Sequence, residues 1–265
     1  MQRQSLLAET KELLRRYGVR PRRRLGQNFI VSRGALRMII DALGLGSDET
    51  VVEIGAGLGT LTLELASRAG KVVAIEIDRR LIKVLEDRLG SRENVELVCG
   101  DVLSMKLPHA DKVVSNVPYS ISSKLLVKLL REPVYKLAVL TFQKEFALRL
   151  VAPVGSGNYG RISVIAQLYA DMEIVGSISR RAFYPQPEVD SLVVRLKPRV
   201  EHREFFEKVE RLTSILFSQR RRKLLKVLRK AGLSYGDVRH VVDLSKRVYE
   251  LSPNEILAIA KMLIA

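Results

Sequence analysis

The sequence is poor in the residues that build disulfides and metal sites. Among its 265 residues are one cysteine, three histidines and no tryptophan. A single cysteine, Cys99, excludes an internal disulfide and is typical of a reducing compartment. Because Cys99 ends an apolar run, we expect it to be a small core residue rather than a nucleophile. The histidines, His109, His202 and His240, are scattered without metal-ligand spacing, so we expect no metal site.

Long apolar runs are also missing. No stretch reaches the roughly 18 residues expected of a membrane span, and we find no secretory signal. The basic beginning of the chain has some features of a transit peptide, but Glu9 and Glu12 argue against one. The composition, with 47% hydrophobic and 28% charged residues, is that of a globular protein with a substantial core. We therefore expect a soluble protein in the cytoplasm.

Acidic residues are too few to balance the basic ones. The net charge is +16 and the isoelectric point is about 10.1. Residues 1–25 carry eight Lys or Arg and two Glu, and residues 199–265 carry fifteen basic and eight acidic residues. Thermophilic proteins are also rich in charge, but they add both signs. The excess at the two ends therefore predicts contact with a polyanion.

Strand-like and helix-like patterns alternate through the first part of the chain. Apolar runs predict strands at 50–55, 71–77, 95–99, 111–115 and 136–142. Helical patterns lie near 33–43, 59–68, 79–89, 122–130, 143–151 and 161–169. Such alternation predicts a parallel sheet covered by helices on both faces. Because 171–179 and 190–197 alternate like an antiparallel pair, we expect an α/β, Rossmann-like sheet, mostly parallel with an antiparallel edge strand.

The sequence predicts three regions. Residues 1–24 form a basic N-terminal arm, with a helix over 1–17 and a connector that Pro21 keeps from being helical. Residues 25–198 form the α/β domain. Residues 199–265 form a small, basic, all-helical domain, with helical patterns near 202–217, 219–231, 234–243 and 253–263.

Four residues after the fourth strand form a compact polar site. The apolar run Lys112–Ser115 is followed by Asn116, Val117, Pro118 and Tyr119. The Asn116 oxygen can accept a hydrogen bond from an exocyclic amine, and Pro118 keeps the preceding backbone extended, so that the Val117 carbonyl can be a second acceptor. Tyr119 offers a ring for stacking. This arrangement suits methylation of a nucleobase amine, although Asn and Pro are also common in ordinary turns.

A second group of polar residues follows the first three strands. The turn after the first strand contains Gly55 and Gly57, which permit a tight turn and a close approach of a ligand. Glu76 ends the second strand, where a carboxylate can hold the hydroxyls of a ribose. Asp101 follows the third strand and can accept from the amine of an adenine. These residues predict a nucleoside pocket, although both acids could instead be helix N-caps, and the glycine pattern also fits a nicotinamide-cofactor enzyme.

Together with the Asn116 segment, this spacing resembles the class I S-adenosylmethionine-dependent methyltransferases that methylate amino groups. Three further segments narrow the resemblance, Leu25–Phe29, Phe142–Ala147 and Phe183–Ser191. In this order they resemble the KsgA-type rRNA adenine N6,N6-dimethyltransferases, over about residues 20–197. One departure is Val117, where that family more often has leucine, but only the backbone of this residue enters the chemistry.

The resemblance implies a cofactor and its contacts. The cofactor is S-adenosylmethionine, so residues 25–198 would be the catalytic domain. Glu76 would hold the ribose of the cofactor and Asp101 its adenine. The other implied cofactor contacts are Gln27, Asn28, Ile30, Gly55, Gly57 and Asn116. The target adenine would leave its stack and lie between the rings of Tyr119 and Phe183.

The resemblance also implies ribosomal RNA as a partner, within a small-subunit particle. The run Gln219–Lys230 has the pattern of a basic amphipathic helix suited to RNA phosphates, although a solvated helix face is a common reason for such a run. The predicted RNA contacts are Arg22, Arg23, Arg24, Arg220, Arg221, Arg222 and Lys223. No exposed apolar seam stands out, so we expect a monomer.

Three other functions remain open at this point. An Erm-type enzyme acting on large-subunit RNA would share Asn28 and the Tyr119 segment, although Phe142–Ala147 and the basic tail favour the small subunit. An assembly factor without catalysis would share the fold, but the intact acceptor and acidic positions favour chemistry. A nicotinamide-dependent oxidoreductase would have no use for Asn116–Tyr119. We expect adenine N6 dimethylation with a role in ribosome biogenesis, and the second methylation rests on the resemblance alone.

Overall fold

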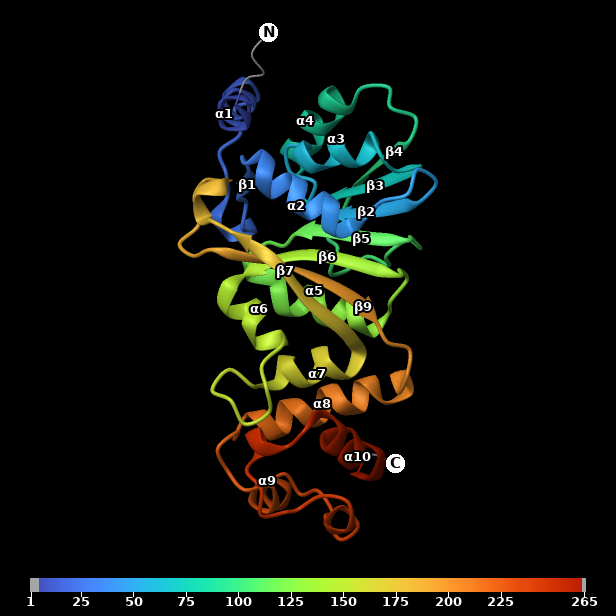
Figure 1. Cartoon of the computed structure of the whole chain (residues 1–265), viewed down its shortest axis with the longest axis vertical. Coiled ribbons are helices and arrows are strands. Elements are labelled where there is room, and N and C mark those ends of the chain that lie inside the picture. The colour runs from blue at the N-terminus through green and yellow to red at the C-terminus, as the bar shows by residue number, and fades with distance from the viewer. Residues whose placement is uncertain (1–4, 264–265) are drawn as a thin grey trace. The chain divides into compact units, whose positions relative to one another are not determined.

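The computed structural model describes residues 5–263, and its elements follow the predicted alternation (Figure 1). The strands are β1 (Phe29–Ile30), β2 (Thr50–Ile54), β3 (Lys71–Glu76), β4 (Val95–Cys99), β5 (Lys112–Asn116), β6 (Leu137–Gln143), β7 (Ala170–Ile178), β8 (Phe183–Tyr184) and β9 (Ser191–Pro198). The helices are α1 (Leu6–Arg16), α2 (Arg33–Leu43), α3 (Thr60–Ala66), α4 (Arg79–Leu89), α5 (Ser122–Arg131), α6 (Lys144–Leu150), α7 (Arg161–Tyr169), α8 (Phe206–Phe217), α9 (Leu224–Lys230) and α10 (Pro253–Leu263). Within the described range, no helix has the length and apolar character needed to cross a membrane.

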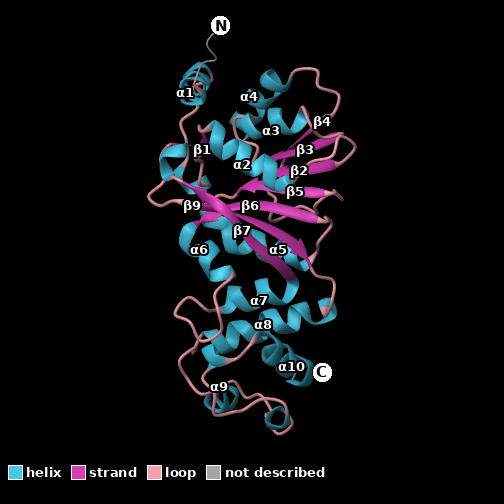
Figure 2. Cartoon of the chain, viewed as in Figure 1, coloured by secondary structure: helices cyan, strands magenta, loops and turns pink. Residues whose placement is uncertain are grey.

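Seven strands form one sheet in the order β4-β3-β2-β5-β6-β9-β7 (Figure 2). Neighbours from β4 to β6 are parallel, and β9 is antiparallel to β6. The predicted α/β, Rossmann-like fold with a mostly parallel sheet is confirmed, and the antiparallel strand lies beside the edge strand β7. Chain order reverses between β2 and β5, the point at which such sheets bind ligands beyond the carboxyl ends of their strands.

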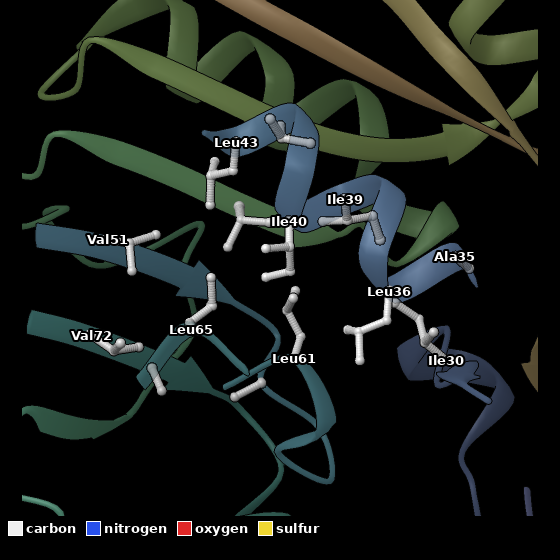
Figure 3. Packing of buried hydrophobic residues seen from close by; sticks show 14 of the residues in the cluster. Ile30, Ala35, Leu36, Ile39, Ile40, Leu43, Val51, Leu61, Leu65 and Val72 are labelled. Carbon is white, nitrogen blue, oxygen red and sulfur yellow. The ribbon is translucent and has the colours of Figure 1, made fainter. Parts of the chain in front are cut away.

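Both faces of the central strands are buried. In β5, Val113 and Val114 are 1% and 0% exposed, although successive residues of a strand point to opposite faces. A continuous apolar cluster joins Val72 of β3 to Ile39 of α2 and Leu65 of α3 (Figure 3). Burial on both sides explains why the strands were readable as nearly unbroken apolar runs.

Side-chain caps begin two of the helices beside the sheet. Ser32 Oγ accepts from the Ala35 N–H at the start of α2, and Asp78 Oδ1 accepts from the Arg80 N–H at the start of α4. Such caps satisfy N–H groups that the first turn of a helix leaves unpaired. Because Asp78 lies two residues after the end of β3, its cap fixes the turn that follows Glu76.

A second, two-stranded sheet was not predicted. β1 and β8 are antiparallel, with Phe29 opposite Tyr184 and Ile30 opposite Phe183. Strands of two residues are too short to show any periodicity, so no sequence pattern predicts them. Their pairing brings the segment Leu25–Phe29 beside the start of the segment Phe183–Ser191.

The N-terminal arm is attached to the α/β region. Leu14 and Val19 belong to an apolar cluster with Leu81 of α4. The Tyr17 hydroxyl donates to Asp87 Oδ2 at 2.7 Å. The predicted helix over 1–17 is found as α1, Leu6–Arg16. Residues 1–4 of the prediction lie outside the described part of the chain.

Internal contacts divide the chain into two units. The first unit contains residues 1–144 and 173–197, and the second contains residues 145–172 and 198–265. This division differs from the predicted domains, because it groups 145–172, which contains α7, most of α6 and the beginning of β7, with the C-terminal helices. Within the second unit, the rings of Tyr169 and Phe206 lie 4.6 Å apart.

The C-terminal region is less helical than predicted. A single helix over 219–231 is wrong, since 219–223 is a turn and α9 begins at Leu224. The predicted helix over 234–243 is also wrong, since only a short 3-10 turn, Val238–His240, is found there.

Pairing between distant segments explains the first of these differences. The Leu224 N–H donates to the Lys246 carbonyl at 2.8 Å, and the Val248 N–H donates to the Arg222 carbonyl at 3.0 Å. The backbone before α9 is therefore bonded to a segment far along the chain and not to its own next turn. A local periodicity cannot reveal such a partner.

Cys99 was expected in the core, and that prediction is wrong. Its side chain is exposed. β4 is one of the two edge strands of the seven-stranded sheet, so its last residue is covered less than the residues of the central strands. An apolar run alone does not distinguish an edge strand from a central one.

Candidate active site

A cavity of about 190 Å³ lies at the carboxyl ends of the strands, where the chain order reverses. Four strand ends contribute Gly55, Glu76, Asp101 and Asn116 to its lining. The predicted residues that line this cavity are Gln27, Asn28, Ile30, Gly55, Gly57, Glu76, Asp101, Asn116 and Pro118. Residues from distant parts of the first unit thus converge where the sequence predicted a nucleoside pocket.

The turn after β2 requires conformations that glycine allows. Gly55, Gly57 and Gly59 have φ angles of +79°, +61° and +80°, which residues with a side chain rarely adopt. A Cβ on Gly57 would lie 3.3 Å from the Phe29 ring, whereas a Cβ on Gly55 would meet nothing within 4 Å. Gly57 is therefore needed for packing, and Gly55 leaves the backbone open to a ligand.

Glu76 organises this turn from the end of β3. It is 5% exposed, its Oε2 accepts from the Gly57 N–H, and its Oε1 accepts from the Asp78 N–H, both at 2.8 Å. Burial raises the pKa of the Glu76 carboxyl, and these backbone hydrogen bonds oppose that rise. A carboxylate can accept about four hydrogen bonds, so Glu76 can still accept from hydroxyl groups in the cavity.

Gln27 connects the basic connector to the same strand end. Its Nε2 donates to Asp78 Oδ2 at 2.9 Å, and its Oε1 accepts from the Arg22 N–H at 2.7 Å. Arg80 donates to both oxygens of Asp78 at 3.0 and 2.6 Å. Hydrogen bonds from Arg80 hold the pKa of Asp78 well below its usual range. The Gln27 side chain therefore fixes the connector beside the cavity.

The side-chain amide of Asn116 has a defined orientation. Its Nδ2 donates to the backbone carbonyl of Asn28 at 2.8 Å. Because the nitrogen is bound on that side, Oδ1 is left to accept from a group in the cavity. Asn28 Nδ2 donates in turn to the Gly26 carbonyl at 3.4 Å. The segment before β1 thus orients the acceptor that was predicted at Asn116.

Gly26 lies close to Pro118 in the segment Asn116–Tyr119, which we call the acceptor segment. This contact was not predicted. Its φ is +62°, and a Cβ there would lie 2.9 Å from Pro118 Cβ and 3.1 Å from Pro118 Cα. Any side chain at this position would push Pro118 away. The sequence shows a glycine at position 26 but does not show that its partner is Pro118, which lies far along the chain.

Val117 and Tyr119 are anchored beside the cavity. Val117 is 2% exposed, and its N–H donates to the Thr141 carbonyl at 3.2 Å, which continues the β5–β6 pairing. The Tyr119 hydroxyl lies 2.8 Å from Ser191 Oγ, and burial raises its pKa. Neither residue is part of the cavity lining, so their roles as acceptor and stacking ring stay predictions.

Glu53 of β2 is a cavity residue that the sequence analysis missed. It is 2% exposed, and its Oε2 has no hydrogen-bond partner among the described residues. Burial raises the pKa of Glu53 from 4.5 to about 8, and the nearby Glu76 adds to the rise. A buried carboxyl oxygen without a partner suits a positively charged ligand group. Within residues 5–263, no cluster of three His, Cys, Asp or Glu residues could hold a metal ion.

Apolar residues complete the lining on the side of β3 and β4. Ile77, which follows Glu76, is 47% exposed and lines the cavity with Val102 and Leu103. An exposed isoleucine beside a buried carboxylate offers a contact for a flat ring. Asp101 Oδ1 accepts from the Leu103 N–H at 2.9 Å, so this carboxylate also closes its own turn. The alternative of a helix N-cap does not apply to Asp101, because a turn and not a helix follows it.

Ile30 and Phe183 both belong to the apolar core. They lie opposite each other in the β1–β8 pair and are 5% and 3% exposed. Both pack in the cluster that contains Leu36 of α2, and Figure 3 shows Ile30 and Leu36 of this cluster. Ile30 also lines the cavity, but Phe183 does not. Phe183 is therefore buried in the core and lies outside the cavity lining, and its role as a stacking ring stays a prediction.

The predicted RNA contacts of the first unit lie in the connector. Arg23 and Arg24 are exposed in a short 3-10 turn, and Arg22 is half-buried. Arg24 also lines the cavity. Arg24 therefore brings a positive charge to the cavity lining.

The predicted RNA contacts of the second unit divide into two kinds. Arg221, Arg222 and Lys223 are exposed, and the described residues include no ion-pair partner for any of them. We call these three residues the basic turn. Arg220 differs, because its Nη2 donates to the carbonyls of Ser156 and Tyr159 at 3.1 and 3.0 Å. Arg220 therefore holds a loop of the second unit.

Comparison with known protein families agrees with this geometry. The model of the family described as ribosomal RNA adenine dimethylase matches residues 18–265. The chain belongs to this family. The members of this family are methyltransferases, so the chain belongs to an enzyme family with a Rossmann-like fold.

Curated relatives match nearly the whole chain. A probable ribosomal RNA small subunit methyltransferase A from Methanosarcina mazei is 40% identical over 266 residues, covering 96% of each chain. A protein of the same name from Methanothermobacter thermautotrophicus is 43% identical over 265 residues, covering 97% of this chain and 96% of the relative.

Two solved structures share the fold at substantial sequence identity. A dimethyladenosine transferase from Plasmodium falciparum has a TM-score of 0.76 and 32% identity, covering 86% of this chain and 94% of that chain. The 23S rRNA methyltransferase ErmE has a TM-score of 0.67 and 30% identity, covering 90% of this chain and 100% of that chain. The family of RNA adenine methyltransferases predicted from the sequence is therefore confirmed.

Proposed function

We propose that this chain transfers methyl groups from S-adenosylmethionine to the N6 amine of adenines in small-subunit ribosomal RNA, forming dimethyladenosine. The observation that carries the proposal is the orientation of Asn116 by the carbonyl of Asn28 at 2.8 Å. That contact presents an amide oxygen to a cavity that also holds two buried carboxyls, Glu53 and Glu76. An oriented neutral acceptor is what an amine nucleophile needs.

The cavity fits the proposed cofactor. Glu76 retains acceptor capacity for the ribose hydroxyls, and Ile77 offers an apolar contact for the adenine ring. Glu53 has an unpartnered buried oxygen, which suits the positively charged methionine end. Gly55 leaves the backbone open beside it. When bound, S-adenosylmethionine supplies an electrophilic methyl group on a positively charged sulfur.

The residues around the target amine make it a nucleophile. The lone pair of adenine N6 is delocalised into the ring, so the free base is a poor nucleophile. Asn116 Oδ1 and the Val117 carbonyl accept the two N6 hydrogens and draw them out of the ring plane, which localises the lone pair on N6. Holding the amine in line with the methyl group supplies a further part of the barrier reduction, about 7–11 kcal/mol in favourable systems.

A second methylation can use the same residues. The first transfer leaves N6 positively charged with two hydrogens and one methyl group, and release of one proton to water leaves one hydrogen and one methyl group. One of the two acceptors still binds the remaining hydrogen, so the lone pair can again be directed toward a methyl donor. The names of the Plasmodium falciparum structure and of the family model, which both specify dimethylation, support this step.

The small subunit is the proposed substrate because of the curated relatives. Proteins named for small-subunit methylation are 40% and 43% identical to this chain over nearly its whole length, whereas the large-subunit enzyme ErmE is 30% identical. The excess of basic residues at both ends fits a polyanionic partner. A preassembled particle as substrate, a role in ribosome biogenesis, a monomeric state and a cytoplasmic location are parts of the same proposal.

Methyl transfer to isolated subunits tests this function. Labelled S-adenosylmethionine is incubated with the protein and with undermethylated small or large ribosomal subunits, and the RNA is then digested to nucleosides. We expect labelled dimethyladenosine from small subunits only. Label in large subunits alone would indicate an Erm-type activity instead. Cofactor binding without transfer to either subunit would favour a non-catalytic assembly factor.

A further inference from the structure

The hydroxyl of Tyr119, which follows β5, is hydrogen-bonded to a serine of β9, on the other side of β6. The Tyr119 hydroxyl lies 2.8 Å from Ser191 Oγ, and Ser191 is 0% exposed at the start of β9. Tyr119 itself follows the end of β5. In the sheet, β6 lies between β5 and β9, so this hydrogen bond links two strands that are not neighbours.

β6 sets the register for both ends of that link. Thr141 of β6 is opposite Asn116, and its carbonyl accepts from the Val117 N–H at 3.2 Å. Two residues further along β6, Gln143 is opposite Ser191. The acceptor segment and Ser191 are therefore both aligned to β6. A change of register in the β5–β6 or the β6–β9 pair would separate the hydroxyls of Tyr119 and Ser191.

The loop before Ser191 is also fixed. Asp190 Oδ1 accepts from the Arg180 N–H at 2.8 Å, and its carbonyl accepts from the Lys144 N–H at 2.9 Å. Arg180 Nη1 donates to the Glu188 carbonyl at 3.0 Å. Ser191 thus reaches Tyr119 from a rigid position, which makes it a suitable anchor for an aromatic ring.

We propose that Ser191 is a positioning residue for methyl transfer, whose hydroxyl holds the Tyr119 ring where it stacks on the target adenine. A phenol has one polar atom, so a hydrogen bond to that atom limits rotation of the ring about its bonds to the backbone. A ring held in one orientation loses less conformational freedom when a base stacks on it. This inference rests on the proposed function and adds Ser191 to its residues.

A double-mutant cycle with Ser191→Ala and Tyr119→Phe tests the link. Each single variant removes one hydroxyl and keeps the rest of the side chain. We expect each to lower kcat/KM for small-subunit methylation about tenfold, with the dissociation constant of S-adenosylmethionine unchanged. The double variant is expected to be no slower than the slower single variant, because both substitutions break the same contact. Ser191→Thr, which keeps a hydroxyl, is expected to recover part of the rate.

Ser163→Ala is the matched control for a buried hydroxyl. Ser163 is 0% exposed, and its Oγ donates to the Arg149 carbonyl at 2.6 Å within the second unit. Its loss is expected to lower stability without lowering kcat/KM. Additive losses in the Ser191 and Tyr119 double variant, or full activity of Ser191→Ala, would overturn the inference while leaving the proposed function intact. A wild-type protein that methylates no RNA would overturn both.

Discussion

The cavity of the first unit and the basic turn of the second unit hold their polar groups in opposite ways. In the cavity, Glu76 and Asn116 are bonded to backbone groups that fix their orientation. In the basic turn, Arg221 and Arg222 are exposed to solvent. Catalysis depends on orientation within a fraction of an ångström, whereas phosphate binding depends on the number of charges. Substitutions should therefore affect rate in the first region and affinity in the second.

The largest effect is expected from Asn116→Ala. Removing the oriented acceptor should lower the rate of methyl transfer by about 100-fold or more, as loss of one oriented polar group does in other active sites, while the affinity for S-adenosylmethionine stays within a few fold. Rates and affinities are measured with small subunits and with cofactor alone. Asn94→Ala is the control, because Asn94 also donates to backbone carbonyls, those of Ala66 and Ala69, away from the cavity. Wild-type turnover in Asn116→Ala would remove this residue from the mechanism.

A steric test of the same region compares two glycines. Gly26 and Gly18 have φ angles of +62° and +60°, but only at Gly26 would a Cβ meet Pro118. Both alanine variants have the same backbone strain of about 1–2 kcal/mol, so the difference between them reports the displacement of the acceptor segment. We expect Gly26→Ala to lower kcat at least tenfold and Gly18→Ala to leave kcat unchanged. Equal activity of the two variants would show that the Gly26–Pro118 contact does not position Asn116.

The buried carboxyl of Glu53 predicts an effect of pH on stability. Its pKa is about 8 in the folded protein, compared with an ordinary value of 4.5, so between these values the folded state binds a proton that the unfolded state has lost. Stability should therefore fall as pH rises from about 4.5 to about 8, by at most about 1.4 kcal/mol per pH unit. Chemical denaturation of the wild type and of Glu53→Gln across this range measures the effect. A variant with the same slope as the wild type would show that Glu53 is not the group responsible.

Smaller effects on catalysis are expected in the second unit. Replacing Arg221, Arg222 and Lys223 with Gln should weaken RNA binding and lower the slope of log affinity against log salt by about two units. Arg220→Gln is the matched control, because Arg220 is bonded to loop carbonyls. Its loss should destabilise the fold by about 1–3 kcal/mol with little change in the salt slope. An unchanged slope in the triple variant would show that the basic turn does not contact phosphates.

The predictable parts of the site were those determined by local sequence. Glu76 and Asn116 end strands whose apolar runs were readable, and parallel strands bring their carboxyl ends to one edge of a sheet. Glu53 was missed because it lies within such an apolar run. Its raised pKa results from burial, which the sequence does not show. Gly26 and Ser191 were missed as contacts because their partners depend on strand register and on β1–β8 pairing.

The same distinction explains the errors in the C-terminal region. The run from 219 to 231 has helical periodicity, but its first residues are bonded to a segment some twenty residues later. Arg221, Arg222 and Lys223 are exposed, but the predicted helical arrangement of this run was wrong. Arg220 was predicted as an RNA contact like its neighbours, whereas its side chain is bonded to loop carbonyls. The burial of Phe183 was likewise not readable from the sequence, because it lies in a strand of only two residues.

The most direct test of the account is single-turnover methyl transfer to undermethylated small subunits at rising enzyme concentration. Asn116→Ala should stay slow at every concentration, because its defect is in the chemical step. The triple variant of the basic turn should approach the wild-type rate at saturation, because its defect is in binding. A triple variant that remains slow at saturation, or an Asn116→Ala variant that recovers, would contradict the separation of chemistry from RNA affinity.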